Sequence, residues 1–170
     1  NPRRNIARLL QAFDQMQERH PSEMRLLIVG ERMWWDSRME KAWSGMRHQD
    51  RVLFTGRLEQ VQLHRALGGA TTLAFVSYFE GFGIPVAEAM RCGVPVVAAA
   101  ATSLPEVAGD AAHYCDPFSV ADIARALHEV CRDADLRTTL STAGITRSQR
   151  YTWNHAATAP SSRPAPHFSG

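Results

Sequence analysis

The chain has 170 residues, of which 45% are hydrophobic, which is ordinary for a globular protein and enough to bury a core. Its 19 Lys and Arg side chains against 17 Asp and Glu give a net charge of +2, too balanced to predict nucleic-acid binding. No apolar run reaches the roughly 20 residues of a membrane span, and three cysteines without a CxxC pair predict reduced, cytoplasmic thiols.

Helices and strands are predicted to alternate along the chain. Helices are expected over residues 6–20, 36–46, 59–67, 120–131 and 134–150. Short apolar runs predict buried strands at 24–29, 52–54, 72–76, 95–100 and 113–115. Strands that alternate with helices indicate a parallel sheet covered on both faces. Asn5 and Ser119 are expected to cap the helices that follow them.

The most informative segment, residues 79–90, is a glycine-rich turn between the strand at 72–76 and a helix that opens at Pro85. Free N–H groups and the positive end of the helix dipole make such a turn a site for phosphate. Glu80 lies beside this site and Glu88 about two helical turns beyond it. Carboxylates repel phosphate but accept hydrogen bonds from sugar hydroxyls, so the pattern favours sugar recognition. On spacing alone, a plain strand–helix turn with two solvated acids is the alternative.

Residues 77–97 closely resemble the donor-binding core of the retaining group 1 glycosyltransferases, enzymes with two facing Rossmann-like domains (the GT-B arrangement). Further matches follow in family order at residues 1–6, 26–30, 52–56, 103–112 and 116–117. The resemblance covers residues 1–157 and implies a Rossmann-like, doubly wound parallel α/β sheet, the C-terminal half of a GT-B enzyme. Residues 158–170 form a Pro/Ser-rich tail that we expect to be disordered.

The resemblance also implies that one strand is missing. In the family this domain begins with a strand just ahead of the segment that matches residues 1–6, and in the strand order 3-2-1-4-5-6 that strand is central. We therefore expect the chain to be a truncated half of an enzyme. The strands at 26–29 and 72–76 would each have an unpaired edge.

Five site residues are assigned by the resemblance within the glycine-rich turn and its helix. The backbone amides of Phe82, Gly83 and Ile84 would hold the donor diphosphate. Glu80 would contact hydroxyls of the donor sugar, and Glu88 would bind the ribose.

Three more site residues lie elsewhere in the sequence. Arg4 aligns with a family position usually held by Lys, whose charge stabilises the leaving diphosphate as the glycosidic bond breaks; Arg keeps the charge but changes the geometry. Gly56 and Arg57 follow a strand where the family passes its backbone near the nucleotide base. By contrast, the sequence D-x-D at residues 133–135 joins two helices far from the turn, so we interpret it as helix capping and predict no metal site.

The resulting hypothesis is a metal-independent glycosyltransferase that uses a nucleotide-diphosphate sugar, with GDP-mannose as a candidate donor. Glu80 and Arg4 would be its catalytic residues, and it would need no cofactor. Its partners would be the donor and a missing N-terminal acceptor-binding domain, through which peripheral membrane association is left open. The isolated chain is expected to be inactive. One alternative is a non-catalytic nucleotide-sugar-binding module. Another, an NAD-binding Rossmann protein, is disfavoured because the glycines at 81 and 83 occur late and lack a third.

Overall fold

Five short strands, all parallel where they pair, carry the fold in the computed structural model, which describes residues 2–32 and 35–151. They are β1 (Leu26–Val29), β2 (Val52–Gly56), β3 (Leu73–Phe75), β4 (Val96–Ala99) and β5 (Ala112–Cys115). Each falls at a predicted strand, and β4, which is buried along its whole length, shows the continuous apolar run typical of a strand covered on both faces. The tail predicted at 158–170 lies outside the described residues.

Helices separate the strands, as the sequence predicts. The α-helices are α1 (Ile6–Arg19), α2 (Ser37–Ser44), α3 (Gln60–Gly68), α4 (Ile84–Arg91), α5 (Leu104–Ala108), α6 (Val120–Arg132) and α7 (Ala134–Ser148). Short 3-10 turns are η1 (Pro2–Arg4), η2 (Gln49–Arg51), η3 (Gly109–Ala111) and η4 (Gln149–Tyr151). No helix in the described part of the chain combines the length and apolar character needed to cross a membrane.

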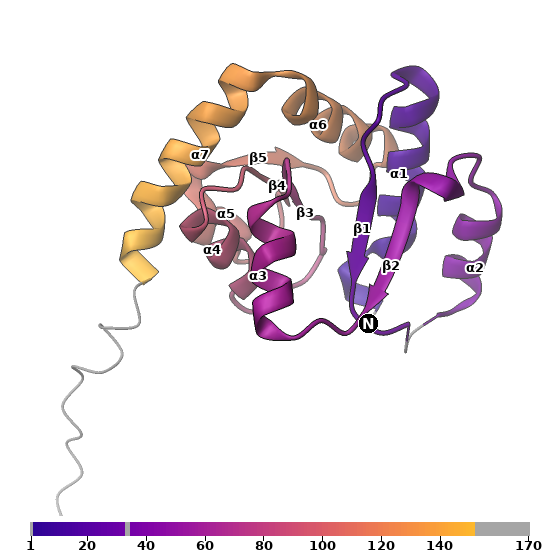
Figure 1. Ribbon diagram of the computed structural model, residues 1–170, viewed down its shortest axis with the longest axis horizontal. Coiled ribbons are helices and arrows are strands. Elements are labelled where there is room, and N and C mark those ends of the chain that lie inside the picture. The colour runs from indigo at the N-terminus through magenta and orange to yellow at the C-terminus, as the bar shows by residue number, and fades with distance from the viewer. Residues whose placement is uncertain (1, 33–34, 152–170) are drawn as a thin grey trace, which may run out of the picture.

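Hydrogen bonds divide the strands into two sheets, β1-β2 and β3-β4-β5. Figure 1 shows β1 and β3 as the strands that face each other between the sheets. The expectation that these two strands have unpaired edges is therefore confirmed. On the face of β1-β2 turned away from the core, the paired residues Leu27 and Leu53 are 42% and 58% exposed. A further strand between β1 and β3 is still a prediction.

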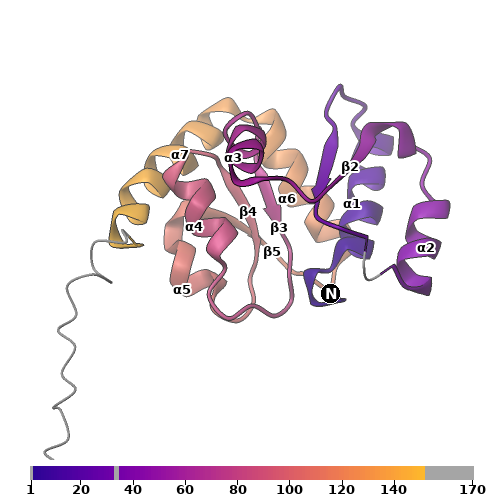
Figure 2. The same ribbon diagram turned by 60° about the horizontal axis from the view of Figure 1, so that its bottom comes forward.

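The core that holds the two sheets together is built on α1, which lies against both α2 and α6 (Figure 2). Its buried apolar residues recur at helical spacing and are Leu9, Leu10, Phe13 and Met16. They belong to one buried cluster with Val97 on the second sheet, and Phe54 on the first sheet packs against this cluster. A second cluster packs α4 and α5 on β4 around Met90 and Leu104, both fully buried. Burial of α1 thus joins sheets that share no backbone hydrogen bonds.

Two of the helix caps follow the prediction and one does not. Ser119 accepts a hydrogen bond from the Asp122 N–H at the start of α6, and Asp133 caps α7 by accepting one from the Leu136 N–H. Asn5 stands at the N-cap position of α1, but its side chain does not cap the helix.

The expected role of Asn5 was wrong because its side chain serves the tertiary structure. Asn5 is only 4% exposed, and its backbone is left-handed, with φ at 62°. Its Nδ2 donates to the carbonyls of Val76, just after β3, at 3.0 Å and of Pro117, in the loop after β5, at 2.6 Å. A buried carbonyl needs a donor, and Asn is among the few residues that tolerate the left-handed region. Asn5 therefore ties the start of α1 to the carboxyl ends of two strands.

Candidate functional site

Parallel strands present their carboxyl ends at one edge of the molecule, and ligands of open α/β sheets bind there. Figure 2 brings this edge forward, with the N-terminal segment and the loops after β3 and β4 along it. The Tyr78 N–H donates to the Arg3 carbonyl at 3.1 Å, so the segment before α1 runs beside the end of β3. The predicted site residues come from segments that meet at this edge.

The strand–turn–helix prediction for residues 79–90 is confirmed, and its geometry depends on Gly83. Gly83 occupies the N-cap position of α4 with φ at 82°, and its carbonyl accepts the Val86 N–H at 3.0 Å. A Cβ at this buried position would lie 2.7 Å from Cδ2 of Leu104. Only glycine therefore fits.

Three backbone amides are left free by this turn. Within the described residues, the N–H groups of Phe82, Gly83 and Ile84 have no hydrogen-bond acceptor. Free N–H groups at a helix start carry a partial positive charge. The turn can therefore accept an anionic group such as a phosphate.

The two carboxylates predicted to bind hydroxyls are half-buried. Among the described residues, neither Glu80 nor Glu88 directs its carboxylate into an ion pair or hydrogen bond. The main chain of Glu80, in contrast, is held on both sides. Its N–H donates to the Thr102 hydroxyl at 3.2 Å, and its carbonyl accepts from the Ser103 hydroxyl at 3.1 Å. A fixed backbone with an unpartnered carboxylate suits a ligand-binding acid.

A pocket of about 690 Å³ lies between the carboxyl ends of β1 and β2 and the start of α1. It contains both cations that the sequence singles out, Arg4 and Arg57, which are exposed. Tyr78 also lines it, so the pocket reaches the segment that leads into the glycine-rich turn. Gly56 is not a lining residue, but it ends β2 directly before Arg57 and accepts the Gly30 N–H at 2.9 Å. The acids and amides of the turn do not line this pocket.

The pocket is strongly basic, which the sequence did not reveal. Its cationic side chains are Arg4, Arg8, Arg32, Arg38, Lys41 and Arg57. Its carboxylates are Glu31 and Asp36. These cations come from η1, α1, α2 and the loops after β1 and β2, and no local motif connects them. An excess of positive charge over a hollow attracts a polyanion such as a diphosphate.

One wall of the pocket is aromatic. The guanidinium of Arg32 lies 4.1 Å from the ring centre of Phe54 and 4.9 Å from that of Trp35. The two rings meet edge to face at 5.6 Å. Such cation–π contacts hold the arginine at the pocket surface without neutralising it.

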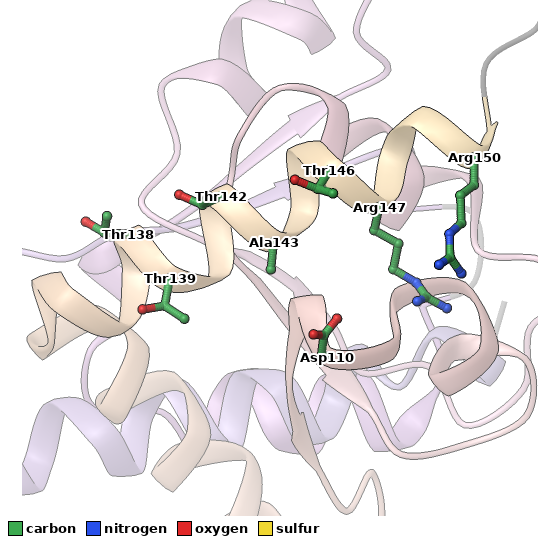
Figure 3. A pocket seen from close by; sticks show the side chains of 8 residues that line it. All are labelled: Asp110, Thr138, Thr139, Thr142, Ala143, Thr146, Arg147 and Arg150. Atoms are coloured by element: carbon green, nitrogen blue, oxygen red, sulfur yellow. The ribbon is translucent and has the colours of Figure 1, made fainter.

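A separate pocket of about 620 Å³ lies along α7, away from the predicted site residues (Figure 3). Threonine hydroxyls and Ala143 form its α7 side. The guanidinium of its Arg147 is already hydrogen-bonded within the protein, because Nε and Nη2 donate to the carbonyls of Val107 and Glu106, both at 2.6 Å. This pocket holds none of the predicted site residues, and we do not place the site there.

Known proteins match this chain over most of its length. The family model described as "Glycosyl transferases group 1" matches residues 1–147. O-antigen chain mannosyltransferase B of Escherichia coli is 32% identical over 157 residues, which cover 92% of this chain and 41% of that protein. The chain thus spans about two fifths of that relative's length.

Two solved structures share the fold. The C-terminal domain of the group 1 glycosyltransferase LpcC from Francisella tularensis has a TM-score of 0.76 at 20% identity, covering 88% of this chain and 80% of that one. A TarM variant from S. aureus, solved with fondaparinux, α-GlcNAc-glycerol and UDP, has a TM-score of 0.80 at 17% identity, covering 92% and 32%. The fold is the Rossmann-like one of the C-terminal half of GT-B glycosyltransferases, and the chain belongs to the group 1 glycosyltransferase family.

Proposed function

We propose that this chain is the donor-binding half of a configuration-retaining glycosyltransferase that uses a nucleotide-diphosphate sugar. One observation carries the proposal: the Gly83 turn offers free amides, with the unpartnered carboxylates of Glu80 and Glu88 before and after it. Amides suit the diphosphate, and carboxylates suit hydroxyls of the sugar and the ribose. The basic pocket at the same edge supports an anionic ligand.

Catalysis would be electrostatic and positional. Amides of the turn and Arg4 would stabilise the charge that develops on the departing diphosphate. Glu80 would orient the sugar, and Glu88 would anchor the nucleotide through its ribose. Gly56 and Arg57 would approach the base. We assign Glu80 to hydroxyls of the sugar and not to attack on its anomeric carbon, so we propose attack of the acceptor on the face that the diphosphate leaves.

The acceptor surface would come from an N-terminal domain, as in the two-domain family. We therefore expect residues 1–170 alone to bind donor without transferring sugar, and peripheral contact with a membrane would fall to the other domain. We place the activity in the cytoplasm, where the unpaired Cys92, Cys115 and Cys131 would stay reduced.

Mannose is our candidate sugar, because the E. coli relative is named a mannosyltransferase. The test is calorimetry with GDP-mannose, UDP-glucose and UDP-N-acetylglucosamine, with GDP and UDP as sugar-free ligands, on the full-length protein. Tight binding of one nucleotide sugar, with release of its nucleoside diphosphate on adding acceptor, is the expected result. Binding without turnover would favour the non-catalytic module, and no binding would contradict both.

Replacing Glu88 with Ala is expected to weaken binding of the nucleoside diphosphate, because a ribose hydroxyl loses its acceptor. A charge-assisted hydrogen bond contributes about 1.5–3 kcal/mol, which corresponds to a rise in Kd of roughly 10- to 150-fold. Asp135→Ala, at an exposed acid in the first turn of α7, is the control and should leave Kd unchanged. Equal Kd values for wild type and Glu88→Ala would remove the ribose role.

Activity is expected to persist in EDTA, because amides, the helix dipole and Arg4 would together neutralise the diphosphate. The D-x-D sequence at residues 133–135 resembles a metal-binding signature, but its Asp133 caps α7. Release of nucleoside diphosphate is measured before and after chelation. Loss of turnover in EDTA, with recovery on adding manganese, would show that the proposed metal-independent mechanism is wrong.

A further inference from the structure

We propose that Thr102 and Ser103 are positioning residues that fix Glu80 for contact with the donor sugar. The inference rests on the proposed function, which assigns that contact to Glu80. Two successive hydroxyls hold both main-chain polar groups of this one residue. The Glu80 N–H donates to Thr102 Oγ1 at 3.2 Å, and Ser103 Oγ donates to the Glu80 carbonyl at 3.1 Å.

The backbone of Thr102, whose hydroxyl makes this contact, is in an unfavourable conformation. Its φ is 49°, in the left-handed region, where a β-branched residue is a true outlier. Glycine would occupy this conformation more easily but would offer no hydroxyl. A conformational cost that persists beside a candidate site is consistent with a hydroxyl required at that place.

The Ser103 hydroxyl bonds to Glu80 and does not cap the helix that follows it. Ser103 stands at the N-cap position of α5, where a serine side chain normally accepts an N–H from the first turn of the helix. Its side chain makes no such bond. Its hydroxyl donates to Glu80 across the loop instead.

The helix behind these hydroxyls is held at both ends. Leu104, at its start, is fully buried against Gly83. At its other end, the Val107 carbonyl accepts from Arg147 at 2.6 Å and from the Tyr151 hydroxyl at 3.1 Å. Figure 3 shows Arg147 extending from α7 toward this segment. A fixed α5 can therefore set the position of Glu80.

Such a role predicts a specific pattern of binding. Glu80 is proposed to contact the sugar, and Glu88 the ribose. Removing the two hydroxyls should therefore reduce recognition of the sugar while leaving the nucleoside diphosphate bound as before. A purely structural role would lower both together.

The experiment compares Thr102→Gly/Ser103→Ala with wild type in the full-length protein. Kd is measured for GDP, for UDP and for whichever of GDP-mannose, UDP-glucose and UDP-N-acetylglucosamine binds to wild type. The kcat and KM for turnover of that donor are measured as well. We expect an unchanged Kd for the nucleoside diphosphate and a fall in kcat of about 10- to 100-fold. The single variant Thr102→Ser keeps both hydroxyls and should turn over the donor at about the wild-type rate. Thr142→Ala, at an exposed threonine of α7 (Figure 3), is the control.

Glu80→Ala separates the two ideas. If Glu80→Ala loses turnover while the double variant keeps it, the positioning role is overturned and the proposed function stands. If Glu80→Ala keeps full turnover, the sugar-binding role of Glu80 fails and the positioning role with it. Parallel loss of nucleoside diphosphate binding, turnover and thermal stability in the double variant would also overturn the inference.

Discussion

Replacing Gly83 with Ala is expected to abolish the donor site and to destabilise the domain. A left-handed backbone costs a non-glycine residue about 1–2 kcal/mol, and overpacking a core costs about 1–3 kcal/mol more. The second cost applies because the new Cβ would lie 2.7 Å from Cδ2 of Leu104, which is fully buried. The close contact and the strained backbone of an alanine together favour displacement of the turn and its amides. We expect donor turnover to fall by about 100-fold or more.

Gly81→Ala is the matched control, two residues earlier in the same turn. A Cβ there would meet nothing within 4 Å, and the backbone is not in the left-handed region. We expect its free energy of unfolding to change by less than about 0.5 kcal/mol. Thermal melts and calorimetry with the donor measure both variants. Similar results for the two alanines would show that the Gly83 conformation is not what builds the site.

Asn5→Ala is expected to lower the free energy of unfolding by about 3–5 kcal/mol. Two carbonyls, of Val76 and Pro117, would lose their buried donor, at about 1–3 kcal/mol each. Alanine would also hold the left-handed backbone less well than asparagine. Asn5 lines the basic pocket beside Arg4, so binding of the nucleoside diphosphate should weaken as well.

Chemical denaturation measures this loss, and two further variants separate its causes. Asn5→Gly accepts the backbone conformation but lacks the donor, so it should recover only the smaller, conformational part. Gln11→Ala, at an exposed position on the same helix, should change stability little. If Asn5→Gly were as stable as wild type, the bridge from Asn5 to the two strand ends would contribute nothing.

Much of the fold and the centre of the site could be predicted from local sequence. Apolar runs predicted the strands, and apolar residues at helical spacing predicted the helices, because burial of a strand or of one helix face selects apolar residues at those positions. The turn at Gly83 was predictable because a left-handed N-cap between a strand and a helix favours glycine. These features depend on neighbours within a few residues, which the sequence displays.

Long-range contacts could not be predicted in this way. Asn5 looked like a helix cap because Asn commonly caps helices, and only packing of α1 against both sheets shows that its amide serves carbonyls 71 and 112 residues away. The cations of the basic pocket come from separate elements, which the parallel topology brings to one edge. The sequence by itself therefore determined the elements, the family and the glycine-rich turn. Which polar groups meet around that turn was decided only by the tertiary structure, because burial and long-range hydrogen bonding set those partners.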